Sequence, residues 1–283
     1  MGTPAAAGRS PPGRGDIVLA QARKLVEQWH PSVETETRAV DGPQARGLLE
    51  QAADASLLVV GGKRRPVAEQ VFTLPPIGVP LSSHAPCPVA VVREADTAVN
   101  APRPLVVVEV DGSPGSLVAL ELAFAQAAAH SAVLRVLQVC RARPGRTSAA
   151  HTEAAGRAEA ELLRATGELR KRDPRVEVEH EVVFGRPVGA LLGEAARALC
   201  LVVGSRRLGG FRGLLLGSVS HALVEHAECP LIVVPVQGAL RGMAWIPTSA
   251  AHTVRAGPSR PRPHRTASPS AENSHSCAGQ GPG

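Results

Sequence analysis

Short apolar runs alternate with longer amphipathic segments along the second half of the chain. The run LVVVEV (105–110) is continuous and rich in β-branched residues, as expected for a strand buried on both faces. Ser113 and Pro114 follow it as an N-cap and a first-turn proline, which predicts that a helix begins there. We expect the inner face of this helix to carry Leu117, Leu120 and Phe124.

The rest of this half continues the alternation of strand and helix. VEVEHEVV (176–183) alternates apolar and charged residues, which is typical of an edge strand with one solvated face. The other predicted elements are, in chain order, a strand over 133–139, helices over 153–172 and 187–199, a strand over 200–204, a helix over 218–227 and a strand over 231–236. Regular alternation of this kind predicts an α/β fold with a parallel, doubly wound sheet.

The first part of the chain is similar to the later part of this pattern. VETETRAV, which starts at Val33, aligns with VEVEHEVV, which starts at Val176. In the same register SLLVVGGKR falls on LCLVVGSRR, and after one deletion HAPCPV falls on HAECPL. We therefore predict an internal duplication.

The first copy lacks any counterpart of residues 105–139. Its predicted elements are a helix over 16–29, a strand near 33–40, a helix over 43–54, and the strands SLLVVG (56–61) and PVAVV (88–92). Without the missing strands, a strand at 33–40 loses its usual neighbours in the sheet. Two interpretations stay open: a degenerate structural partner, or a start codon placed too late.

The two ends of the chain, residues 1–15 and 237–283, differ in amino-acid composition from the part between them. The predicted organisation is a disordered segment 1–15, an incomplete domain 16–96, a linker 97–103, a complete domain 104–236 and a disordered tail 237–283. The tail is rich in Pro, Arg, Ser and Gly and has no apolar periodicity. The net charge of +6 arises from the two ends, so the folded part is neutral. This distribution argues against a dedicated nucleic-acid surface.

The five cysteines are odd in number, dispersed and mostly next to apolar runs, which indicates buried, reduced thiols. No apolar run approaches the roughly 20 residues of a membrane span, and the first residues have no apolar core that a signal peptide needs. We therefore expect a cytoplasmic protein without a membrane partner.

The segment from Gly204 to Ser220 carries the strongest chemical signal. It begins where a strand ends and finishes where a helix begins, and ligands of open α/β sheets bind at such strand ends. A helix N-terminus offers unpaired N–H groups and partial positive charge to a phosphate. Gly217 permits close backbone approach, the hydroxyls of Ser218 and Ser220 add donors, and Arg206 supplies a cation.

These residues, together with VEVDGSPGS near the first strand, resemble the universal stress protein family. Nucleotide-binding members carry Gly, two residues, Gly, nine residues, then Gly-Ser or Gly-Thr. This chain matches that motif at Gly204, Gly217 and Ser218, with Arg207 in place of the second glycine. The resemblance implies a flavodoxin-like sheet of order 3-2-1-4-5 that binds ATP, with Mg²⁺ as a possible companion.

The same resemblance implies which residues bind the nucleotide. Those expected near the nucleoside are Val110, Asp111, Gly112, Ser113 and Val139. Those expected around the ribose and phosphates are Gly204, Ser205, Arg206, Arg207, Gly217, Ser218, Val219 and Ser220. By themselves, residues 111–114 are equally consistent with a simple turn and helix cap.

Arg207 leaves two alternatives open. A non-glycine residue at a position that needs positive φ costs roughly 1–2 kcal/mol, whereas an inward guanidinium would add a phosphate contact. In the first copy, Pro75 and Pro76 stand where the second has Gly217 and Ser218, so no nucleotide is expected there.

The half-motifs His84-x-x-Cys87 and His226-x-x-Cys229 lead into apolar strands without further ligands, so we expect packing and no metal site. No catalytic triad, Walker lysine or carboxylate pair is evident, so no enzyme is expected, although slow ATP hydrolysis stays open. The leading hypothesis is a stress-response protein with a regulatory nucleotide. The resemblance also implies that the last strand LIVVPV pairs across a dimer interface, so we expect a homodimer or, with PVAVV of the first copy as the partner, a pseudo-dimer inside one chain. The alternative is a scaffold without a nucleotide that acts through this strand-mediated association.

Overall fold

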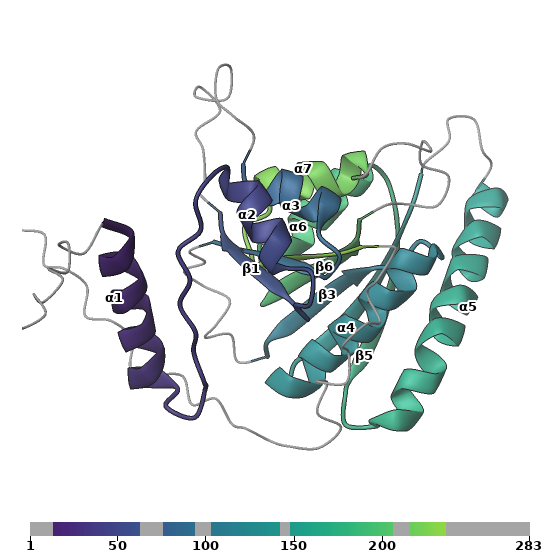
Figure 1. Ribbon diagram of the computed structural model, residues 1–283. Coiled ribbons are helices and arrows are strands. Elements are labelled where there is room, and N and C mark those ends of the chain that lie inside the picture. Colours follow the sequence, from purple (N-terminus) through teal and green to yellow (C-terminus); the bar gives the residue numbers. More distant parts are fainter. Residues whose placement is uncertain (1–13, 63–75, 94–102, 142–147, 206–215, 236–283) are drawn as a thin grey trace, which may run out of the picture.

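The computed structural model describes residues 14–62, 76–93, 103–141, 148–205 and 216–235. Seven strands form one sheet in the order β1-β2-β7-β6-β3-β4-β5 (Figure 1). The strands are β1 (Leu58–Gly61), β2 (Val89–Val92), β3 (Leu105–Glu109), β4 (Val133–Cys140), β5 (Val178–Phe184), β6 (Cys200–Gly204) and β7 (Leu231–Val234). The helices are α1 (Arg14–Trp29), α2 (Gln44–Gln51), α3 (Gly78–His84), α4 (Pro114–His130), α5 (Ser148–Arg172), α6 (Pro187–Ala195) and α7 (Ser218–His226).

The five strands of the second copy stand in the predicted order. Numbered within that copy, β5, β4, β3, β6 and β7 give 3-2-1-4-5, and all their pairings are parallel. β3 is central because it pairs with β4 on one side and β6 on the other, and its Val106, Val107 and Val108 are fully buried. The continuous apolar run therefore marks a strand covered on both faces, as predicted.

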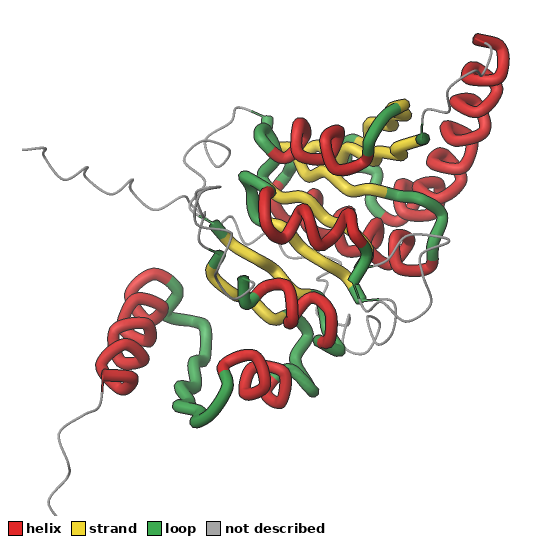
Figure 2. Tube along the Cα trace, turned by 90° about the horizontal axis from the view of Figure 1, so that it is seen from above, coloured by secondary structure: helices red, strands yellow, loops and turns green. Residues whose placement is uncertain are grey.

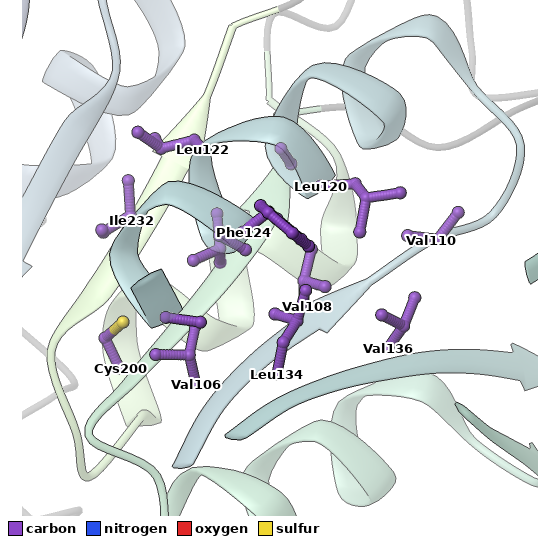
Figure 3. Close-up of a cluster of buried hydrophobic side chains, with 14 of the residues drawn as sticks. Val106, Val108, Val110, Leu120, Leu122, Phe124, Leu134, Val136, Cys200 and Ile232 are labelled. Carbon is purple, nitrogen blue, oxygen red and sulfur yellow. The ribbon is translucent and has the colours of Figure 1, made fainter. Parts of the chain in front are cut away.

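Helices cover both faces of the sheet, so the fold is doubly wound. One face packs against α4 and α5, where Leu120, Phe124 and Leu162 meet Val108 and Leu134 (Figure 3). The other face packs against α2, α3, α6 and α7.

The start of α4 follows the sequence prediction, with one exception on its inner face. Ser113 is the N-cap and its hydroxyl accepts a hydrogen bond from the Ser116 backbone N–H at 3.2 Å. Leu120 and Phe124 are buried, but Leu117 is 43% exposed, so its predicted burial is wrong. In the first turn of α4, Gly115 and Ser116 are the residues buried against the end of β6, and Leu117 does not share that contact.

The two copies join through their last strands. β2 pairs antiparallel with β7, with Val89 opposite Val233 and Val91 opposite Leu231. β1 extends the sheet beyond β2 in a parallel pair. The internal pairing of PVAVV with LIVVPV is thus present within the chain, and it makes one continuous sheet from both copies.

The first copy departs from the prediction where it is incomplete. Residues 34–40 form no strand, and Val33 and Val40 are 52% and 47% exposed. The counterpart of residues 33–40 in the second copy is β5, which pairs with β4. No described strand of the first copy corresponds to β4, so the backbone of residues 34–40 has no neighbouring strand to pair with. Figures 1 and 2 show α1 set apart from the sheet.

Element ends differ from the predicted ones where apolar patterning is weak. Helix α5 begins at Ser148 instead of residue 153, and α6 ends at Ala195 instead of residue 199. Helix α3 was not predicted, because its sequence GVPLSSH is short and carries an internal proline. Among the described residues, no helix is both long and apolar enough to cross a bilayer.

Candidate functional site

The two predicted halves of the site meet where the winding direction of the sheet reverses. The chain runs from β3 to β4 on one side, whereas β6 lies on the other side of β3. A Cβ added at Gly204, the last residue of β6, would lie 3.1 Å from the backbone of Gly115 and Ser116 in the first turn of α4. The ends of β3 and β6 are therefore adjacent, at the position where open α/β sheets bind ligands.

The first half is the loop after β3. Val110 is buried and its N–H donates to the Leu137 carbonyl at 2.9 Å, which continues the ladder toward β4. Gly112 has φ +79°, a conformation that favours glycine. The Ser113 N–H donates to Asp111 Oδ1 at 3.0 Å, and Ser113 then caps α4. Asp111 and Ser113 thus form the turn and cap that were one of the two alternatives for this motif.

The second half is a loop closed at its base. The Ser205 N–H donates to the Val234 carbonyl at 2.7 Å, and the Gly217 N–H donates to the Ser205 carbonyl at 2.8 Å. The chain therefore returns at Gly217 beside the point where it left the sheet. Arg206 and Arg207, which were predicted to contact the phosphates, lie outside the described residues.

Helix α7 begins at this closed base. Its N-cap is Gly217, in extended conformation, and no side chain among the described residues caps it. Ser218 is exposed, whereas Val219 is buried at 6% exposure. The first amides of α7 and the positive end of its dipole are thus available to an anion beside Ser218.

Ser220 and Gly204 have structural roles that the sequence did not predict. The Ser220 hydroxyl donates to the Gly204 carbonyl at 2.8 Å and is 2% exposed, so its proton is used to hold α7 against the end of β6. Gly204 is required by the close approach of α4, which leaves no room for a Cβ without a shift. Both residues shape the site, and neither presents a side-chain donor to a phosphate.

Two buried residues border the site from neighbouring strands. Val139, predicted near the base, lies one residue before the end of β4 and is 4% exposed, within the core on the α6 and α7 face. Glu109, the last residue of β3, is a carboxylate with only 3% exposure. Glu109 was not among the predicted site residues, although a single acid inside a β-branched run was the available signal.

The described part of the first copy, residues 14–62 and 76–93, contains no equivalent of this arrangement. No strand or loop there corresponds to β3 and residues 110–113. Its β1 ends at Gly61, and α3 begins only at Gly78, after Pro76. Pro75 and the rest of 63–75 lie outside the described residues.

Burial governs the chemistry of the described cysteines. Cys87, Cys200 and Cys229 are free, buried thiols, and Cys140 is half-buried. Burial raises the pKa of Cys200 to about 12 and that of Cys229 to about 11, so both thiols are protonated near neutral pH. No group of three metal-ligating side chains occurs within the described ranges.

Comparison with known proteins gives one consistent result. The model of the universal stress protein family matches residues 4–93 and 104–235. A universal stress protein of Mycolicibacterium smegmatis is 34% identical, over 76% of this chain and 75% of that protein. One from Mycobacterium tuberculosis is 33% identical, over 76% of this chain and 73% of that protein.

A solved structure supports the fold independently. The crystal structure of a universal stress protein from Archaeoglobus fulgidus has a TM-score of 0.51 to this chain at 20% identity, and the match covers 78% of this chain and 79% of that one. At this identity the likeness concerns the α/β fold alone.

Proposed function

This chain belongs to the universal stress protein family, and on that premise we propose that its second copy binds ATP or a related nucleotide as a regulatory ligand. The observation that carries the proposal is the contact between the start of α4, directly after the Asp111 loop, and the end of β6, to which the Ser220 hydroxyl ties the start of α7. The start of α7, which no described side chain caps, and the glycine-containing turn at Gly112 therefore flank the same strand ends, and this pairing suits a phosphate on one side and a nucleoside on the other.

The proposed orientation follows from the charges. The phosphates bind the first amides of α7 beside Gly217 and Ser218 and the cation of Arg206, next to the end of β6 at Gly204 and Ser205. The nucleoside binds against Val110, Asp111, Gly112 and Ser113, with Val139 beneath the base. Mg²⁺ accompanies the phosphates and is not held by a dedicated protein cluster.

The proposed role is regulation in the cytoplasm, without turnover. A ligand can shift a conformational or assembly equilibrium only by its differential affinity for the two states. The closed base at Ser205 and Gly217 connects the site to β7 through the Val234 carbonyl, and β7 is the strand that joins the two copies. Binding at α7 is therefore placed to act on the pairing of the copies.

The second candidate is a scaffold that binds no nucleotide. Arg207 replaces the second glycine of the family motif, and the first copy lacks the strands of a complete site. In this case strand-mediated association through β2 and β7 is the retained function.

Calorimetry with the full chain distinguishes the two candidates. ATP, ADP and AMP are titrated with and without Mg²⁺ into wild type, Ser218→Asp and Arg207→Gly. Ser218→Asp places a like charge at the phosphate position, so micromolar affinity in the wild type should be lost in this variant. The matched control is Thr37→Asp, which adds the same acid at an exposed position of the first copy, in the segment 34–40 that forms no strand, and should bind like wild type.

Two outcomes contradict the nucleotide proposal. Unchanged affinity in Ser218→Asp would show that the site lies elsewhere. Absent binding in wild type with binding in Arg207→Gly would show a disabled site and support the scaffold.

A further inference from the structure

An arginine of the first copy is buried against the nucleotide-site helix of the second. Arg93 follows β2 directly and is only 7% exposed. Its Nη1 donates to the Ala227 carbonyl at 2.9 Å, and its Nη2 donates to the Val224 carbonyl. Both carbonyls belong to the last turn and C-cap of α7.

This contact supplies what a helix end lacks. The last carbonyls of an α-helix have no partner within the helix, and they carry the negative end of its dipole. A guanidinium presents two donors in a fixed fork and a permanent positive charge, so it satisfies two carbonyls at once. Arg93 therefore caps α7 from a position more than 130 residues away in the chain.

The first copy makes room for this side chain. A Cβ added at Gly62, just after β1, would lie 3.2 Å from Nε and 3.3 Å from Cγ of Arg93, and 2.9 Å from Cγ1 of Val91. Gly62 is fixed in place because its N–H donates to the Val92 carbonyl at 2.8 Å. The absence of a side chain at Gly62 thus sets the space that Arg93 fills.

The duplication shows that the cap acts in one direction. In the alignment of the copies, Gly62 corresponds to Ser205 and Arg93 corresponds to Pro235. Proline has neither a charged side chain nor a backbone N–H, so Pro235 cannot cap α3 as Arg93 caps α7. The incomplete copy therefore caps a helix of the complete copy through Arg93, and the aligned Pro235 provides no such cap for α3.

Helix α7 is consequently held at both ends. The Ser220 hydroxyl ties its first turn to Gly204, and Arg93 ties its last turn to β2. The helix has nine residues, so its two ends are only about 13 Å apart at 1.5 Å per residue. Helix α3 of the first copy also packs directly against α7, since a Cβ added at Gly78 would lie 3.1 Å from Val224 Cγ1.

We infer that Arg93 is a positioning residue through which the incomplete copy sets the placement of α7, and thereby the nucleotide affinity of the complete copy. The affinity part of this inference rests on the proposed function. Since coupling is reciprocal, nucleotide bound at Ser218 also strengthens the docking of the first copy onto α7.

The experiment uses the full chain and two readouts. Arg93→Met keeps the apolar stem and removes both donors, and Arg93→Lys restores the charge with one compact donor group. The control is Arg46→Met, which makes the same substitution at a 79%-exposed arginine in α2 of the first copy and leaves Arg93 in place. Amide hydrogen exchange over residues 218–226 is measured without nucleotide, and ATP affinity is measured by calorimetry.

Arg93→Met should exchange faster over α7 and bind ATP about two- to thirtyfold more weakly than wild type. Arg93→Lys should lie between the two, and Arg46→Met should match wild type in both readouts. If α7 exchanges as slowly in Arg93→Met as in Arg46→Met, the positioning role is overturned, whatever the affinity. If α7 of Arg93→Met exchanges faster while ATP affinity is unchanged, the coupling between Arg93 and nucleotide binding is overturned. A wild type without ATP affinity would defeat the proposed function, and the exchange data would still decide the role of Arg93 in placing α7.

Discussion

The Ser220 hydroxyl donates a hydrogen bond of 2.8 Å to the backbone carbonyl of Gly204, across 16 residues of chain. This bond fixes the first turn of α7 against the end of β6, beside the proposed phosphate position. It also explains why a serine that resembles a ligand donor in the sequence is 2% exposed in the fold.

Ser220→Ala should lower the free energy of unfolding by about 1–3 kcal/mol, because the Gly204 carbonyl is left buried with one partner fewer. Urea denaturation measures the change. Ser218→Ala is the matched control, since Ser218 is exposed two residues earlier in the same turn and should change stability by less than about 0.5 kcal/mol. Equal losses in both variants would contradict the structural role of Ser220.

Gly204→Ala should destabilise the second copy by about 1–3 kcal/mol, because the new Cβ would lie 3.1 Å from the Gly115 and Ser116 backbone. The neighbouring atoms are backbone and cannot rotate away, so β6 and α4 must separate slightly. Thermal and urea unfolding of the purified variant measure the loss.

The control for this change is Gly156→Ala in the middle of α5. A Cβ at Gly156 meets nothing within 4 Å, and alanine is a better helix former than glycine. Gly156→Ala should therefore stabilise the chain by about 0.5–1 kcal/mol. A neutral Gly204→Ala would show that α4 and β6 are not packed as closely as described.

The order of the second-copy strands was predictable from the family resemblance, and periodicity predicted which runs are buried and which is at the edge. LVVVEV is apolar throughout and becomes the central strand, whereas VEVEHEVV alternates and becomes the edge strand β5. The pairing of β2 with β7 was predictable because the duplication shows two equivalent last strands and the resemblance implies that such strands pair.

The errors arise where tertiary context decides. Residues 33–40 have the pattern of a strand, but a strand needs a neighbour and the first copy has no β4. Arg93 is a single arginine after a strand, and only the fold brings it to Val224 and Ala227. Ser220 fits a ligand motif, and its bond to Gly204 depends on how α7 meets β6.

Arg135→Met should destabilise the chain by about 1–3 kcal/mol. Arg135 lies in β4, where its guanidinium bonds Glu194 at 2.6 Å and Glu179 at 2.9 Å with 22% of its side chain exposed. Removal of the cation leaves the 14%-exposed Glu194 carboxylate near a like charge. Urea denaturation of the variant gives the loss.

The control for Arg135 is an exposed ion pair of similar length. Lys171 and Glu168 are 2.7 Å apart, with both side chains 75% exposed, so Lys171→Met should change stability by less than about 0.5 kcal/mol. The interpretation fails if the two substitutions have the same effect.

The stability of the chain should fall as the pH rises above about 9. Burial raises the pKa of Cys200 to about 12 and that of Cys229 to about 11, from 9.0 for a free thiol. Between these values the unfolded chain loses thiol protons that the folded chain retains, so the unfolded state is favoured by about 1 kcal/mol per pH unit for each thiol. The chain has no tyrosine that would titrate in the same range. Urea denaturation from pH 8 to pH 11 should show a shallower decline in Cys200→Ala than in wild type. Parallel declines in wild type and Cys200→Ala would mean that the Cys200 thiol ionises as readily in the folded chain as in the unfolded one.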